Sequence, residues 1–214
     1  ALSQWLGEQT GATVGFLTEA ANTVGAQVVN ALPGSGGLNA GQMLAGGLRA
    51  ALLLNCEPGA DSAPADLSAC EMVVTLSPFK ANMDISDVLL PIAPFTETSG
   101  SFVNAEGRVQ SFHAVVRPLG DTRPGWKVLR VLGDLLGLQQ PAYETSPEVL
   151  AQALGAGVTD RVPENRLSNR ASARADVRAH AGSVPYLGIY QLDGIVRRAP
   201  SLQLTADACE GASA

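Results

Sequence analysis

The sequence predicts an α/β protein with a Rossmann-like parallel sheet and helical crossovers. Three strand-like runs carry this prediction, at residues 51–54, 72–76 and 87–90. Each is rich in aliphatic residues without a polar alternation, which is typical of parallel strands covered on both faces. A proline or a turn cluster follows each run, and segments of helical composition separate the runs. This alternation of strands and helices favours a parallel sheet over an antiparallel meander.

Short helices are expected between these strands, at residues 64–70 and from Pro78 to about residue 86. Another is expected after Asn39, because asparagine is a favoured N-cap residue. A loop of Gly34, Ser35, Gly36 and Gly37 precedes it. This loop lacks the Gly-Lys-Ser/Thr ending of a phosphate-binding loop, so we interpret its glycines as turn residues.

The clearest helix is expected after residue 121. Its apolar residues recur on one helical face: Val128, Leu129, Leu132, Leu135 and Leu136. Asp121 or Thr122 is the expected N-cap, Pro124 falls in the first turn, and Gly137 suits the carboxyl end.

A β-hairpin is expected between the third strand and this helix. Residues 102–103 and 109–110 can pair only if the chain reverses within the four residues 104–107. A type I turn followed by a left-handed residue does this, and Gly107 stands where the positive φ is needed. Asn104 can cap the turn with its side chain.

Composition excludes several functions. The net charge of −6 argues against nucleic acid as a partner. No apolar run approaches the roughly 20 residues needed to cross a bilayer, so we expect no direct membrane insertion. Cys56, Cys70 and Cys209 lie far apart and no residues match a metal-ligand spacing, so we expect no metal site in this chain.

Residues 1–140 are expected to form the domain, and residues 141–214 a helical and linker segment that leads to an absent C-terminal domain. A helix is expected at residues 147–154. Arginines recur every four residues at 166, 170, 174 and 178, which indicates a solvated helix face or a docking patch for an acidic neighbour. Because the chain begins without methionine, we expect a piece of a larger subunit, truncated at its N-terminus.

Residues 87–110, with the sequence DVLLPIAPFTETSGSFVNAEGRVQ, carry a resemblance. A strand ending in Leu90-Pro91 is followed by a Glu97-x-x-Gly100 turn and by the hairpin that starts at Asn104. This order resembles the molybdopterin oxidoreductase superfamily. Within this superfamily, the amino-acid sequence of the segment is most similar to the large iron–sulfur subunits of NADH:quinone oxidoreductase (respiratory complex I). Further patches agree at residues 21–25, 53–58, 111–112, 118–120, 123–133 and 195–203.

The resemblance implies part of domains 1–3 of the molybdopterin oxidoreductase and formate dehydrogenase fold. The parent enzyme would pass electrons from NADH to quinone, coupled to proton translocation, through [4Fe-4S] and [2Fe-2S] clusters held elsewhere. This portion would be a structural scaffold without catalytic residues or cofactors. It would contact other peripheral-arm subunits, on the cytoplasmic side of a bacterial inner membrane or the matrix side in a mitochondrion.

One turn is a candidate binding site. Asn55, Glu57 and Pro58 follow the first predicted strand, and parallel sheets bind ligands at the carboxyl ends of their strands. In the molybdenum enzymes that this chain resembles, the turn faces the guanine dinucleotide arm of the cofactor. The alternative function is therefore a formate dehydrogenase-like oxidoreductase that binds a pterin guanine dinucleotide here. A third is a vestigial nucleotide-binding module used only for assembly.

The cysteine and histidine spacing makes a testable prediction. We expect the purified chain to carry no metal and no visible chromophore, because a cluster needs four suitably placed ligands. Elemental analysis checks this, and stoichiometric iron, zinc or molybdenum would contradict it.

Overall fold

The computed structural model describes residues 2–15, 17–18, 20–60, 64–138, 142–158, 160–163, 189–191, 193–206 and 208. The chain divides into two compact units. The sheet unit comprises residues 38–92, 121–125 and 179–214, and the hairpin unit comprises residues 1–37, 93–120 and 126–178. Among the described residues, no helix has the length and apolar character needed to cross a membrane.

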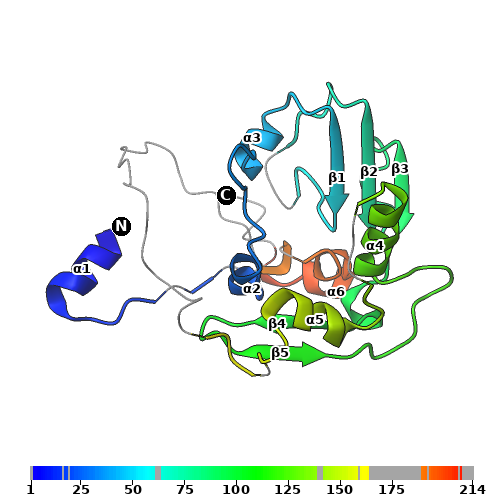
Figure 1. Ribbon diagram of the computed structural model, residues 1–214. Coiled ribbons are helices and arrows are strands. Elements are labelled where there is room, and N and C mark those ends of the chain that lie inside the picture. The colour runs from blue at the N-terminus through cyan, green and yellow to red at the C-terminus, as the bar shows by residue number, and fades with distance from the viewer. Residues whose placement is uncertain are drawn as a thin grey trace. The chain divides into compact units, whose positions relative to one another are not determined.

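The sheet unit contains three parallel strands. These are β1 (Ala50–Leu54), β2 (Met72–Ser77) and β3 (Val88–Pro91), and they lie side by side in the order β1-β2-β3 (Figure 1). In register, Leu52 pairs with Val74, which pairs with Val88. The predicted α/β class and the parallel sheet are therefore confirmed.

The central strand forms the core of this sheet. Thr75 and Leu76 of β2 are fully buried, and the Thr75 hydroxyl shares a hydrogen bond with that of Ser86 at 2.7 Å. The edge strand β1 differs, because Leu52 and Leu54 are 48% and 43% exposed. The expectation that β1 is covered on both faces was wrong, since alternate residues of this edge strand face outward.

The two crossover segments contain turns where helices were expected. At residues 64–70, Asp66 Oδ1 accepts hydrogen bonds from the Ser68 amide (3.1 Å) and hydroxyl (2.6 Å). Such side-chain bonds to the nearby backbone compete with helix formation. At residues 78–86, Asn82 adopts a left-handed conformation (φ 56°), which interrupts a helix. Both helix predictions were wrong for these local reasons.

The helix after Asn39 is confirmed as α3 (Ala40–Leu44). The Asn39 side chain accepts from the Gln42 amide, and the Gln42 side chain accepts from the Asn39 amide, each at 2.9 Å. This reciprocal pair is a capping box. In the preceding loop the Gly37 amide donates to the Gly34 carbonyl and Gly36 has φ 80°, so the loop is a tight turn.

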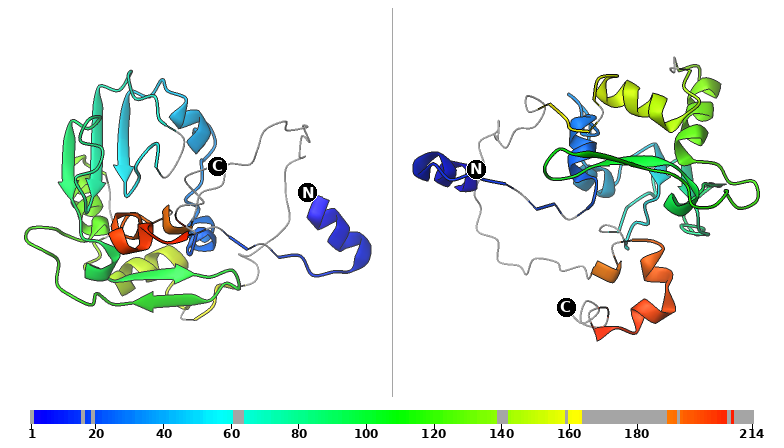
Figure 2. Two further views of the ribbon diagram at one scale, coloured as in Figure 1. Left: turned by 180° about the vertical axis from the view of Figure 1, so that it is seen from behind. Right: turned by 90° about the horizontal axis from the view of Figure 1, so that it is seen from below.

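The hairpin unit packs helices against two antiparallel strands, β4 (Gly100–Val103) and β5 (Val109–Phe112). Helices α2 (Thr23–Val28) and α5 (Ser146–Leu154) lie beside this hairpin (Figure 2). Their shared apolar core consists of Val103, Val109, Leu154 and Val162, with Val24, Val28, Leu150 and Val158 packed against it. Helix α1 (Leu2–Thr10) and a 3-10 turn, η1 (Phe95–Glu97), also belong to this unit.

A polar contact attaches helix α2 to the hairpin. The Val103 amide, on a residue only 4% exposed, donates to Asn22 Oδ1 at 2.9 Å. A β-carbon on Gly25 would lie 2.0 Å from that same oxygen. Glycine at position 25 therefore makes room for the Asn22 side chain, which accounts for these two residues of the 21–25 patch.

The long helix α4 (Gly125–Leu135) begins later than expected. Arg123 is extended and pairs with Ile92 as an isolated parallel bridge, so neither Asp121 nor Thr122 is the N-cap. At the other end Gly137 has φ 72°, as predicted for a terminating glycine. Leu135, which was expected on the apolar face of this helix, is 81% exposed. The apolar face of α4 is therefore not buried along its whole length.

The C-terminal segment contributes η3 (Ile189–Gln191), η4 (Val196–Arg198) and α6 (Pro200–Gln203) to the sheet unit. Helix α5 matches the helix expected at residues 147–154, with Thr145 and Glu148 forming a capping box. The arginines at 166, 170, 174 and 178 lie outside the described residues. The division of the chain at residue 140 stays a prediction.

The hairpin turn has the predicted geometry and supports a test. The Gly107 amide donates to the Asn104 carbonyl at 2.9 Å, and Gly107 has φ 79°. A β-carbon at a left-handed position costs about 1–2 kcal/mol, so Gly107→Ala should lower the opening free energy of the hairpin by that amount. Hydrogen exchange of the hairpin amides measures it. Ala105→Ser is the control and should change little; equal behaviour of the two variants would show that the turn type is wrong.

Candidate functional site

The predicted turn lies at the carboxyl edge of the sheet, where β1 and β2 end. Asn55 continues the ladder by donating its amide to the Leu76 carbonyl at 3.0 Å. Its φ of 48° then turns the chain, and asparagine tolerates this left-handed conformation. Cys56, Glu57 and Pro58 follow and are half-buried. The sequence therefore places these residues at the edge where parallel sheets bind ligands.

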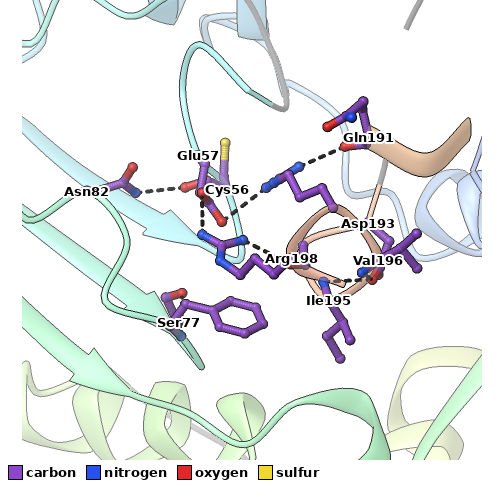
Figure 3. A network of polar contacts seen from close by, with 12 residues as sticks. Cys56, Glu57, Ser77, Asn82, Gln191, Asp193, Ile195, Val196 and Arg198 are labelled. Carbon is purple, nitrogen blue, oxygen red and sulfur yellow. Dashed lines mark hydrogen bonds and ion pairs between the residues drawn. The ribbon is translucent and has the colours of Figure 1, made fainter. Parts of the chain in front are cut away.

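The Glu57 carboxylate has an arginine on each oxygen. Arg197 Nη2 lies 3.0 Å from Oε1, and Arg198 Nη2 lies 2.8 Å from Oε2. These side chains are largely buried, with exposures of 19% for Glu57, 11% for Arg197 and 34% for Arg198. Figure 3 shows Glu57 and Arg198 facing one another. Charge-assisted contacts of this length are the stronger kind of hydrogen bond.

The C-terminal segment holds both arginines in place. Arg197 Nη1 donates to the Gln191 carbonyl and Arg198 Nη1 to the Gly194 carbonyl, each at 2.9 Å. Asp193 Oδ1 accepts from the amides of Ile195 and Val196, which starts the turn that presents the arginines. The two arginines carry one more positive charge than Glu57 balances, and each guanidinium also donates to a backbone carbonyl.

An aromatic ring completes the site. The Arg198 guanidinium carbon lies 4.2 Å from the centroid of the Phe79 ring, within the range of a cation–π contact. Phe79 follows β2, and its amide donates to Ser77 Oγ at 3.1 Å. Arg198 therefore contacts residues from both strand ends.

The electrostatics favour an ionised Glu57. The hydrogen bond from Arg198 is the largest influence and lowers the pKa of Glu57; burial opposes it, and Arg197 lowers the pKa further. A lowered folded-state pKa stabilises the structure at pH values above the ordinary carboxyl pKa. That contribution is lost as the pH falls through the lowered value.

A second side chain fastens the two strand ends to each other. Asn82 Nδ2 donates to the Cys56 carbonyl at 2.9 Å and lies 3.4 Å from Thr75 Oγ1. Because Cys56 follows β1 and Asn82 follows β2, this amide fixes the turn that carries Glu57. Figure 3 shows Asn82 directed at Cys56.

Sequence reasoning found one member of this site and missed four. Glu57 takes part, whereas Asn55 is exposed and contributes its backbone. Phe79, Asn82, Arg197 and Arg198 were missed as site residues. Adjacent arginines in the 195–203 patch were a signal, but nothing in the sequence joined them to a glutamate 141 residues away.

Several of the described side chains at this edge bind one another. No group of three or more histidine, cysteine, aspartate or glutamate residues in the described ranges is arranged to hold a metal. Arg130 Nε is the buried side-chain polar atom without a partner that those ranges contain, and Arg130 lies in the other unit. At the edge, Glu57, Arg197, Arg198 and Asn82 bind partners within the chain.

Comparison with known proteins shows the family of this chain. A family model described as molybdopterin oxidoreductase matches residues 2–135. The chain belongs to the molybdopterin oxidoreductase family. At the edge described above, both oxygens of the Glu57 carboxylate bind arginines of this chain.

Individual relatives match over short segments. The chain is 45% identical over 56 residues to the mitochondrial NADH-ubiquinone oxidoreductase 78 kDa subunit of Candida albicans, and 44% identical over 57 residues to that of Neurospora crassa. It is 40% identical over 52 residues to a putative formate dehydrogenase of Staphylococcus aureus. These segments cover 26%, 27% and 24% of this chain, and 8%, 8% and 5% of the relatives.

The fastening role of Asn82 can be tested against a matched asparagine. Asn82→Ala removes the part-buried bond to the Cys56 carbonyl and should destabilise the sheet unit by about 0.5–1.5 kcal/mol, the net contribution of a typical hydrogen bond. Asn30→Ala is the control, because Asn30 has a similar φ of 58° and is exposed. Hydrogen exchange of the amides nearest each site gives the local loss. Equal losses at the two positions would show that backbone strain alone, and not the side-chain bond, matters.

Proposed function

We propose that this chain is part of the large iron–sulfur subunit of an NADH:quinone oxidoreductase. In that enzyme electrons pass from NADH to quinone, coupled to proton translocation, through iron–sulfur clusters held outside these residues. This portion serves as a structural scaffold with no redox ligand of its own.

The observation that carries this proposal is the state of the carboxyl edge. A working molybdenum enzyme needs that edge for its cofactor, whereas here Glu57 binds two arginines of the same chain. The 78 kDa subunits of Candida albicans and Neurospora crassa support the same parent enzyme. A domain of this family that keeps the parallel sheet, and whose carboxyl edge is occupied by its own arginines, is suited to a scaffold role.

The proposed partners and location follow from this parent. The scaffold would contact the cluster-bearing part of its own subunit and neighbouring subunits of the peripheral arm. That arm would lie on the cytoplasmic side of a bacterial inner membrane, or on the matrix side in a mitochondrion. The net charge of −6 suits docking on basic protein surfaces better than binding to nucleic acid.

A second function is favoured by one observation, the 40% identity to a putative formate dehydrogenase. On this alternative the chain is part of a molybdenum oxidoreductase, and Asn55, Glu57 and Pro58 face a pterin guanine dinucleotide. It requires the arginines to leave Glu57, or the nucleotide to bind elsewhere.

One purification separates the two functions. The native assembly is isolated through an affinity tag on the protein that contains this chain. It is then assayed for NADH–quinone and formate–dye reduction, for molybdenum, and for guanine nucleotide released by acid. We expect co-purified subunits of a quinone reductase, NADH-dependent activity and no molybdenum. Stoichiometric molybdenum with guanine nucleotide and formate-dependent activity would contradict the proposal and establish the alternative.

A further inference from the structure

We propose that residues 189–191 and 193–206 form a self-docking segment that closes the carboxyl edge of the parallel sheet through the Glu57 carboxylate. We call the contact of Arg197 and Arg198 with Glu57 and Phe79 the arginine latch. The latch occupies the Glu57 carboxylate, which the edge would otherwise offer to a ligand. This inference holds whichever enzyme contains the chain.

The docked segment is too short to hold its shape alone. Its elements η4 and α6 are three and four residues long. Isolated helices below about 12 residues are marginal in water even with favourable sequences. The internal hydrogen bonds of the segment, such as that from the Ala199 amide to the Val196 carbonyl at 3.0 Å, therefore need an external anchor.

Contacts between the described residues of this segment and the carboxyl edge of the sheet converge on that anchor. Arg197 and Arg198 both reach Glu57, and Arg198 also covers the Phe79 ring. Inside the segment, Gln203 Nε2 donates to the carbonyls of Tyr190 and Val196, which joins its first turn to its last. Loss of the anchor should thus release the segment as one piece.

The charge of Glu57 is what keeps the segment docked on the sheet. Without the Glu57 carboxylate, Arg197 (11% exposed) would keep a carbonyl partner, and Arg198 (34% exposed) a carbonyl partner and the Phe79 ring. A buried charge without its counter-ion is strongly destabilising, and this applies most to Arg197. The segment would then be better solvated off the sheet. Glutamine at position 57 keeps the shape of the side chain and removes only its charge.

Hydrogen exchange measured by mass spectrometry on the full chain tests the latch. Glu57→Gln should speed exchange of the amides at 195–203 by about ten- to a hundredfold, as expected when hydrogen bonds to a charged group are lost. Exchange across β2, at residues 73–76, should not change, because the buried strand reports on the sheet itself.

The matched control is Glu71→Gln. Glu71 also pairs with an arginine of the sheet unit, since Arg49 Nη2 lies 2.9 Å from Glu71 Oε1, but both side chains are exposed, at 68% and 84%. Exposed pairs contribute little, so this variant should leave the 195–203 exchange unchanged.

A second variant covers the case in which Glu57→Gln unsettles the whole sheet. The double change Arg197→Gln and Arg198→Gln leaves the strand ends intact and alters only the docked segment. We expect it to release residues 195–203 without faster exchange in β2. Unchanged exchange at 195–203 in both variants, or equal acceleration of β2 and the segment in both, would overturn the proposal.

Discussion

The Glu57 carboxylate joins two parts of the sheet unit that lie 141 residues apart in the sequence. Two arginines bind it, one on each oxygen, and an aromatic ring lies under one of them. A partly buried carboxylate needs such partners, because desolvation without them would raise its pKa instead of lowering it. The position of the C-terminal segment, the state of the carboxyl edge and the proposed scaffold role all depend on this one interaction.

Local chemistry determined which elements the sequence could predict. The parallel strands were predictable from their aliphatic runs, and the hairpin turn from Asn104 and Gly107, since both signals lie within a few residues. The two crossover helices were not, because Asp66 and Asn82 bind nearby or distant backbone in ways that composition does not show. Of the site, Glu57 was predictable from its place after a strand. Its arginine partners required the folded chain, because no sequence spacing connects residues so far apart.

Membership of the family does not by itself fix the function of this chain. The match over residues 2–135 shows the molybdopterin oxidoreductase family, and the sheet edge retains the place where such a fold accepts a nucleotide. The residues at that place are engaged with one another instead. Such an edge suits the proposed scaffold role, since a fold does not by itself imply a function.

A double-mutant cycle on Glu57 and Arg198 tests the latch most directly. Glu57→Gln, Arg198→Gln and the double variant are compared through the opening free energy of the 195–203 segment. We expect the two changes to be coupled by more than about 0.5 kcal/mol, as found for residues in direct contact. Losses that add to within about 0.5 kcal/mol would show that the two side chains act independently, and would contradict the account.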